Sequence, residues 1–172
     1  MMIEIKPMET EAEIRGKAYV HWKSWQEAYA GIVDAGYLAD LTLEKCEERA
    51  FRWTENLLVA KVGSKVVGFA GYGACGDEDL PGAGEVFAIY VLSEYCGTGV
   101  GEELMRAALD RLGAYDAVAV WVLRDNARAI RFYEKWGYRA DGAEKTLTLG
   151  TPVSVIRMLL RRQNEGPLVG EG

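Results

Sequence analysis

Two strongly apolar segments, separated by a glycine-rich turn and a helical run, constrain the fold of this chain most. Residues 84–92 (GEVFAIYVL) and 117–123 (AVAVWVL) have the composition of buried strands, and residues 99–114 (GVGEELMRAALDRLGA) have the apolar periodicity of a helix. Strands joined by a crossover helix lie parallel in one sheet. The sequence therefore predicts a β-α-β unit within an α/β fold.

The rest of the chain predicts a mixed sheet in which most neighbouring strands are antiparallel. The other predicted elements are strands at residues 3–7, 56–62, 65–74, 146–149 and 153–160, and helices beginning at Thr10, at Thr42 and at Asn126. Thr10 with Glu13 three residues later is the capping-box pattern of a helix start. Gly63–Ser64 between two apolar segments is a two-residue hairpin turn. The predicted order is β-α-α-β-β-β-α-β-α-β-β, a mixed α/β sandwich.

Length and composition are those of one ordinary globular domain. The chain has 172 residues, of which 49% are hydrophobic and 27% charged. We expect a single domain over residues 1–160 and a loose tail over residues 161–172, which have little to bury. No apolar run approaches the roughly 20 residues of a membrane helix, and the N-terminus lacks a signal-peptide pattern. Three scattered cysteines without a CxxC pair fit a reducing cytoplasm.

Charge and metal-ligating residues exclude several classes of function. The net charge is −6, and no Lys/Arg stripe is available to contact phosphates, so we expect no nucleic-acid partner. His21 is the single histidine, and we expect no metal site. His21 lies in an aromatic-rich predicted helix, which favours a packing role over a catalytic one. The C-terminal strands are compatible with a homodimer.

Gly97, Gly99 and Gly101 stand at alternate positions just before the predicted central helix. A dinucleotide-binding fingerprint would need glycine where Glu102 stands, and no P-loop pattern is present. Free backbone N–H groups at a helix start, together with the helix dipole, bind phosphate groups. The turn is therefore either a pyrophosphate site or a flexible strand-to-helix connection.

The segment VLSEYCGTGVGEELMRAAL resembles the acetyl-coenzyme-A-binding motif of the GNAT superfamily of N-acetyltransferases, Arg/Gln-x-x-Gly-x-Gly/Ala. Gly99 and Gly101 match the motif, whereas Cys96 stands at the Arg/Gln position. Because a short neutral side chain forfeits one polar contact, we expect weaker cofactor affinity. The segment NARAIRFYEKWGY resembles the family's later motif, Asn-x-x-Ala-x-x-x-Tyr-x-x-x-Gly-Phe/Tyr. The matching residues are Asn126, Ala129, Tyr133, Gly137 and Tyr138.

This resemblance covers roughly residues 56–160 and implies both a fold and a reaction. The implied fold is α/β, with a GNAT-like mixed, mostly antiparallel sheet flanked by helices and a parallel strand pair splayed around the cofactor. The implied reaction moves an acetyl group from acetyl-CoA to a primary amine of a small molecule or of a protein, by direct transfer in a ternary complex. The alternative is a non-catalytic acyl-CoA-binding sensor or adaptor of the same fold.

The resemblance also assigns residues to the cofactor. They are Val91, Cys96, Gly97, Thr98, Gly99, Val100, Gly101, Asn126 and Tyr133. The backbone N–H near Val91 is expected to face the developing oxyanion. Asn126 and Tyr133 are close to two helical turns apart and share one helix face, although Asn126 is also a good N-cap. Arg128, or a neighbouring basic residue such as Arg131 or Lys135, is a candidate for the 3′-phosphate.

Catalytic groups follow from the chemistry of amine acetylation. Tyr133 is the candidate general acid for the departing thiolate, and a neighbouring helix N-terminus is expected to lower its pKa. Glu85 is the candidate base, because an acid in the apolar strand EVFAIYV is out of pattern; the alternative is an exposed strand end. Glu27 and Asp34 are the other candidate bases. The presence of Tyr133 favours an enzyme over a binding module.

The amine acceptor has no motif of its own in this chain. Trp25 and Tyr29 are either core residues or the wall of an acceptor pocket that attracts an ammonium group. The acids in loop 74–84 either attract a cationic substrate or form a solvated turn; they are Asp77, Glu78 and Asp79. The segment SWQEAYAGIVDAGYL resembles a stretch of small bacterial acetyltransferases, some of which act on polyamines.

Overall fold

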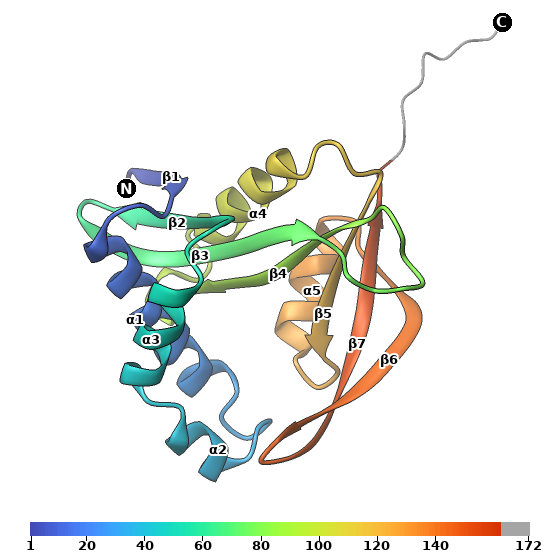
Figure 1. Cartoon of the computed structure of the whole chain (residues 1–172), viewed down its shortest axis with the longest axis horizontal. Coiled ribbons are helices and arrows are strands. Elements are labelled where there is room, and N and C mark those ends of the chain that lie inside the picture. Colours follow the sequence, from blue (N-terminus) through green and yellow to red (C-terminus); the bar gives the residue numbers. More distant parts are fainter. Residues whose placement is uncertain (163–172) are drawn as a thin grey trace, which may run out of the picture.

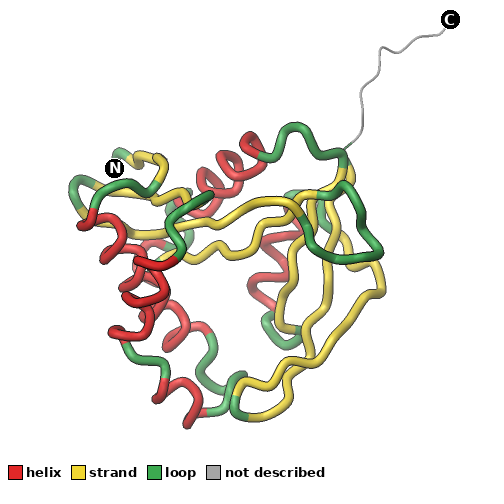
Figure 2. The backbone as a smooth tube through the Cα atoms, in the orientation of Figure 1, coloured by secondary structure: helices red, strands yellow, loops and turns green. Residues whose placement is uncertain are grey.

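The computed structural model describes residues 1–162. A strongly twisted sheet with strand order β1-β2-β3-β4-β5-β7-β6 carries the helices (Figures 1 and 2). Along the chain the elements are β1 (Ile3–Pro7), α1 (Glu11–Ala28), α2 (Ala35–Asp40), α3 (Leu43–Arg52), β2 (Leu57–Val62), β3 (Lys65–Ala74), β4 (Gly84–Val91), a 3₁₀ turn η1 (Ser93–Tyr95), α4 (Val100–Arg111), β5 (Ala117–Leu123), α5 (Ala127–Lys135), β6 (Arg139–Leu149) and β7 (Thr151–Arg161). None of the helices in this part of the chain is long and apolar enough to cross a membrane.

The predicted elements are all present, with two differences in extent and one additional helix. β6 begins seven residues earlier than predicted, because its first half is a solvent-exposed edge without apolar alternation. The additional helix, α2, has six residues and is too short to show a helical period. Arg161, predicted to open the tail, ends β7, and the backbone N–H of Arg162 donates to the carbonyl of Asp116 (2.8 Å). The rest of the predicted tail lies outside the described residues.

Helices α1 and α4 cover opposite faces of β3. Phe69 lies on the α1 side, where the Lys17 ammonium stands 4.8 Å from its ring centroid. The neighbouring Gly68 lies against Leu104 and Val100 of α4. Since successive residues of a strand point to opposite faces, the two helices must sandwich this strand. The main core lies in these two layers.

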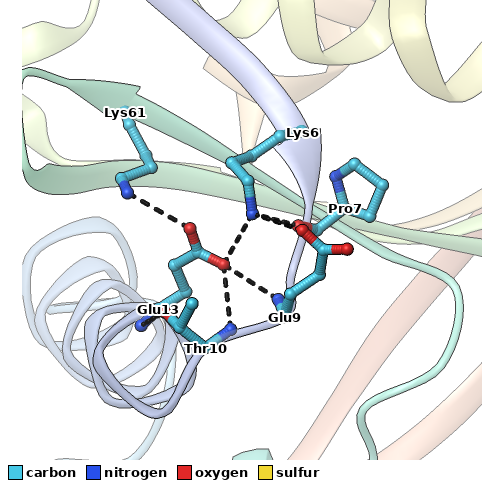
Figure 3. Close-up of polar contacts among 6 residues, drawn as sticks. All are labelled: Lys6, Pro7, Glu9, Thr10, Glu13 and Lys61. Carbon is cyan, nitrogen blue, oxygen red and sulfur yellow. Dashed lines mark hydrogen bonds and ion pairs between the residues drawn. The ribbon is translucent and has the colours of Figure 1, made fainter.

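The start of α1 is fixed by a buried carboxylate, as Figure 3 shows. The Glu13 carboxylate, 2% exposed, accepts hydrogen bonds from the backbone N–H groups of Glu9 (2.9 Å) and Thr10 (3.1 Å). The backbone N–H of Glu13 in turn donates to Oγ1 of Thr10 (3.1 Å). Lys6 and Lys61 pair with its two oxygens at 2.7 and 3.1 Å. Burial alone would raise the pKa of Glu13, but these hydrogen bonds lower it to about 2. The predicted capping box thus joins α1 to β1 and β2.

Strands β4 and β5 are parallel, as predicted, but they pair over two residues only. Their register joins Gly84 to Val118 and Glu85 to Ala119, after which they diverge (Figure 1). In the β3–β4 ladder, the neighbours Gly71 and Tyr72 oppose Ala88 and Val86, so Phe87 is the extra residue of a β-bulge. A bulge bends its strand and interrupts pairing. The splayed parallel pair leaves one edge of β4 without a strand beside it.

Candidate active site

A cleft of about 520 Å³ lies where β4 and β5 diverge. Its walls come from α1, β4, β5, the turn before α4, α5 and the β6–β7 hairpin. Eleven of the residues predicted for the site line it: Trp25, Glu27, Tyr29, Glu85, Val91, Cys96, Gly97, Gly101, Asn126, Arg128 and Tyr133. Thr98, Gly99 and Val100 belong to the same turn but do not line the cleft. The structure therefore brings residues from both ends of the chain to one site.

The three alternate glycines serve two different purposes. Gly97 and Gly99 have φ angles of 80° and 97°, in the left-handed region that side chains with a Cβ rarely adopt. Gly101 has an ordinary φ, but a Cβ there would lie 3.3 Å from Cε1 of Phe132. The first two glycines shape the turn, and the third lets α4 approach α5 closely.

The first turn of α4 presents unused backbone donors. Its N-cap is Gly99, which has no side chain to cap the helix. The N–H of Glu103 donates to the carbonyl of Gly99 (3.0 Å), and the N–H groups before it have no acceptor within the helix. Such groups and the helix dipole favour an anion. Glu102, on the cleft wall, places a carboxylate in the same turn.

Cys96 closes the connection between β4 and α4. Its Sγ donates to the carbonyls of Val91 (3.8 Å) and Leu92 (3.6 Å), on the strand side of turn η1. The hydroxyl of Thr98 donates to the carbonyl of Tyr95 in the same turn. Both side chains therefore hold the backbone of the turn in place.

Helix α5 supplies an amide and a phenol to the cleft. Asn126 is the N-cap, and its Oδ1 accepts from the N–H of Ala129 (3.2 Å), which leaves its amide NH₂ as a donor. Tyr133 is 8% exposed. Burial raises the pKa of the Tyr133 hydroxyl well above 10, so the expected lowering by a helix N-terminus is wrong. Of the three basic candidates for the 3′-phosphate, only Arg128 lines the cleft among the described residues.

The free edge of β4 directs backbone N–H groups into the cleft. The N–H of Leu92 donates to the carbonyl of Val67 on β3 (2.9 Å). Because successive N–H groups of a strand point to opposite edges, those of Val91 and Ile89 face the side from which β5 has diverged. Val91 was predicted for this role. Ile89 was not predicted for it, because only the structure shows that the N–H groups of Ile89 and Val91 lie on the same unpaired edge of β4.

Glu85 lies at the closed end of the cleft, where β4 and β5 are still paired. It is half-buried, and one side-chain atom each of Cys75, Asp77 and Glu85 lie within 4.8 Å of one another. Burial raises the pKa of the Glu85 carboxyl, and the Asp77 charge acts in the same direction, partly offset by a hydrogen bond from Cys75. Phe87, the bulge residue, is 55% exposed on the same wall.

The other two candidate bases are placed differently. Glu27 lines the cleft, is exposed and accepts a hydrogen bond from the Ser93 hydroxyl (2.9 Å). Asp34 caps α2 by accepting from the N–H of Tyr37 (3.0 Å), and it does not line the cleft. Glu85 and Glu27 are therefore the candidate bases at this site.

Aromatic side chains of α1 pack on β4 beside the cleft. The Trp25 and Tyr29 ring centroids are 4.8 Å apart, and the hydroxyls of Tyr29 and Tyr90 are hydrogen-bonded (3.1 Å). His21 packs against Trp25, Phe69 and Tyr90, the role expected for it. Burial lowers the pKa of His21 to about 4, so the imidazole is neutral. Trp25 and Tyr29 are both core residues and part of the cleft wall.

The acids of loop 74–84 are engaged by an arginine from a distant strand. Arg157 of β7, 5% exposed, pairs with Asp77 (3.1 Å), Asp79 (2.7 Å) and Asp141 (2.7 Å). The prediction of a solvated turn holds for Glu78 and Asp79, which are exposed, whereas Asp77 is partly buried; Arg157 occupies both Asp77 and Asp79. They tie the loop to β7, and the partner lies about 80 positions away in sequence.

Comparison with known proteins agrees with this geometry. The sequence model of the Acetyltransferase (GNAT) family matches residues 19–138. The chain belongs to this family. YuaI, an uncharacterized N-acetyltransferase of Bacillus subtilis (strain 168), is 29% identical over 175 residues, which cover 94% of this chain and 100% of YuaI. An uncharacterized N-acetyltransferase of Archaeoglobus fulgidus is 33% identical over 119 residues, 62% of this chain and 76% of that protein.

A solved GNAT-type structure has the same fold. The PaiA N-acetyltransferase of Thermoplasma acidophilum, in complex with coenzyme A, matches with a TM-score of 0.71 over 94% of this chain and 99% of the other. The sequence identity is 22%, so this likeness concerns the fold alone. It confirms the predicted GNAT-like sheet with one parallel pair.

Three residues of the cleft escaped the sequence analysis for related reasons. Ile89 and Phe87 belong to an apolar strand, and their residue types are those of core positions. Only the structure distinguishes them from core residues: Phe87 is the extra residue of a bulge, and Ile89 lies where β4 has no neighbouring strand. Lys145 lines the cleft from β6, which is 60 positions away from Glu85 in sequence. A charged residue on an exposed edge strand carries no local signal of a site.

Proposed function

We propose that this GNAT family member transfers the acetyl group of acetyl-CoA to a primary amine, by direct transfer between two substrates bound together in the cleft. One observation carries the proposal. A single cleft joins the free first turn of α4, the unpaired edge of β4, the phenol of Tyr133 and the carboxylate of Glu85. These are the groups that hold a thioester and move protons during acyl transfer.

The turn before α4 fits the pyrophosphate of coenzyme A. Cβ atoms placed on Gly97 or Gly99 would meet nothing within 4 Å, so a ligand can approach the backbone closely. The free N–H groups of the first helical turn supply donors, and Asn126 adds a side-chain donor on α5. The PaiA structure contains coenzyme A, which supports a coenzyme A ligand for this chain. Cys96 and Glu102 add no positive charge, which supports the expectation of modest affinity.

The proposed transfer forms one bond and breaks another. The neutral amine attacks the thioester carbonyl carbon, the C–N bond forms, and the C–S bond breaks. Glu85 takes the proton that leaves the nitrogen, through water, and Tyr133 donates a proton to the departing sulfur. The N–H groups of Ile89 and Val91 stabilise the oxygen that becomes negative.

The ionisation of the two side chains bears on these roles differently. The raised pKa keeps the Tyr133 phenol protonated throughout the neutral range, so it has a proton to give, but it also makes the phenol a weaker acid than an ordinary tyrosine, and donation must be driven by the negative charge that develops on the sulfur. A general base works best when its pKa approaches the working pH, and burial shifts the Glu85 pKa in that direction. Glu27 shares the cleft and remains the second candidate base.

Thiol release tests the proposal directly. The purified chain is mixed with acetyl-CoA and a panel of amines, and both free thiol and acetylated product are measured. We expect amine-dependent thiol release that Tyr133→Phe slows strongly without changing acetyl-CoA binding. Binding of acetyl-CoA without thiol release for any amine would instead indicate an acyl-CoA-binding sensor, the alternative that Cys96 favours.

A further inference from the structure

We infer that the acceptor is a small amphoteric amine of the amino-acid type, with an apolar side chain, whose anionic group binds Lys145. This inference rests on the proposed function and names its acceptor class. It follows from which charges of the cleft remain free once the ion pairs of the fold are counted.

The acceptor end of the cleft is the part lined by Glu85, Phe87, Trp121, Lys145 and Leu147, and its charges are one half-buried carboxylate and one ammonium group. Asp77 and Asp79 pair with Arg157 and offer little to a ligand. Glu85 and Lys145 both line the cleft, and neither forms an ion pair among residues 1–162. A ligand with an amine and an anion complements this pair of free charges.

Lys145 is held at the wall by an aromatic ring and forms no ion pair with the residues that the structure describes, although its charge also acts on Glu85. Its Nζ lies 4.1 Å from the ring centroid of Trp121, which also lines the cleft. Trp121 is itself fixed, because its Nε1–H donates to Asp77 (3.0 Å). A cation–π contact positions an ammonium group and leaves its charge available to a carboxylate. The Arg157 network therefore also orients the ring on which Lys145 rests.

The same charges disfavour a polyamine. A polyamine carries several ammonium groups and needs a carboxylate for each one that is bound. The other carboxylates of the cleft belong to its opposite end: Glu27 is exposed and accepts a hydrogen bond from Ser93 of η1, and Glu102 lies in the first turn of α4. A second ammonium group would meet Lys145 as a like charge. Phe87 and Leu147 line the same end of the cleft; both are apolar and exposed, and they suit a hydrocarbon side chain of the acceptor.

Lys145 is separated from the cofactor-binding elements. β6 is the edge strand, with β7 and β5 between it and β4 in the sheet. The glycine turn and α5 lie at the other wall of the cleft. Removing the Lys145 charge should therefore change recognition of the acceptor and leave acetyl-CoA binding unchanged.

Matched pairs of amines test the inference by thiol release. Phenylalanine is compared with phenethylamine and leucine with 3-methylbutylamine, since each pair differs only by the carboxylate; spermidine and a carboxy-amidated phenylalanine complete the panel. We expect kcat/KM to be at least about 10-fold higher for the carboxylated members, and Lys145→Met to remove roughly that factor while phenethylamine changes less than about 3-fold. Lys145→Arg should retain most of the preference. Lys45→Met, on α3 outside the cleft, is the matched control.

Four outcomes would overturn the inference: spermidine as the best acceptor, equal rates within each pair, an equal loss for both members in Lys145→Met, or weaker acetyl-CoA binding in that variant. Calorimetry with phenylalanine in the presence of coenzyme A gives a second readout that needs no turnover. If phenylalanine binds and Lys145→Met abolishes this binding, the inference is supported even when no amine is acetylated. Absence of acetylation in that case would overturn the proposed function alone. Absence of phenylalanine binding together with absence of turnover would overturn both.

Discussion

The two walls of the cleft are built from different kinds of chemical groups. The wall formed by the α4 turn and the β4 edge offers mainly backbone donors, placed by glycines and by a bulge. The wall formed by β6 and β7 offers side chains, and behind it the ion pairs of Arg157 with loop 74–84 fix the ring of Trp121 on which Lys145 rests. Backbone donors suit a ligand part that is always the same, whereas side chains can be exchanged to suit different acceptors. The difference separates cofactor binding from acceptor choice.

Tyr133→Phe is expected to have the largest effect on turnover. Loss of the general acid should lower kcat by roughly 10²- to 10⁴-fold, because the thiolate must then leave without a proton. Acetyl-CoA affinity, measured by calorimetry, should stay within about two-fold of the parent. A variant as fast as the parent would remove Tyr133 from the mechanism.

Glu85→Gln should lower kcat by roughly 10- to 100-fold and change its pH dependence. The base acts when deprotonated, and burial places its pKa above the ordinary 4.5, so activity of the parent should fall as the pH drops through that raised value. The Gln variant, assayed with the same acceptor, should lack this decline. An unchanged profile would transfer the role to Glu27, for which Glu27→Gln is the matching variant.

Gly99→Ala tests the wall of backbone donors alone. A Cβ at φ 97° meets no neighbouring atom, so the variant carries only backbone strain of about 1–2 kcal/mol. In the free protein the turn relieves this strain by leaving the left-handed conformation, and acetyl-CoA must restore it, so we expect binding to weaken by up to roughly 5- to 30-fold while the preference among acceptors is unchanged. An altered acceptor preference with normal cofactor affinity would contradict the division between the walls.

Glu13→Gln should leave both walls intact and affect stability alone. It removes a buried charge that pairs with Lys6 and Lys61, which should lower the free energy of unfolding by about 2 kcal/mol. The Glu13 contribution is complete above pH 4.5 and is lost as the pH falls toward 2, since its pKa is lowered on folding. Denaturant unfolding at pH 7 and pH 3 should show a smaller difference between variant and parent at pH 3. Equal differences at both pH values would contradict this role.

The groups proposed to bind the cofactor were largely predictable, because they lie in two short segments of the sequence. Gly97, Gly99 and Gly101 mark the turn by their spacing, and Asn126 and Tyr133 share one helix face. Their ionisation was not predictable, since the pKa of Tyr133 depends on burial by residues from other elements. The acceptor wall was missed because strand pairing brings Lys145 to the cleft and Arg157 to the ion pairs behind it, and neither placement leaves a local pattern in the sequence.

The most direct test of the account measures both products of one reaction. The chain is incubated with acetyl-CoA and phenylalanine, and free thiol and N-acetylphenylalanine are quantified by colour reaction and mass spectrometry. We predict that the two products appear in equal amounts, and that omission of the amine abolishes both. Saturable acetyl-CoA binding without an acetylated product from any amine of the panel would contradict the central claim that this cleft transfers acetyl groups.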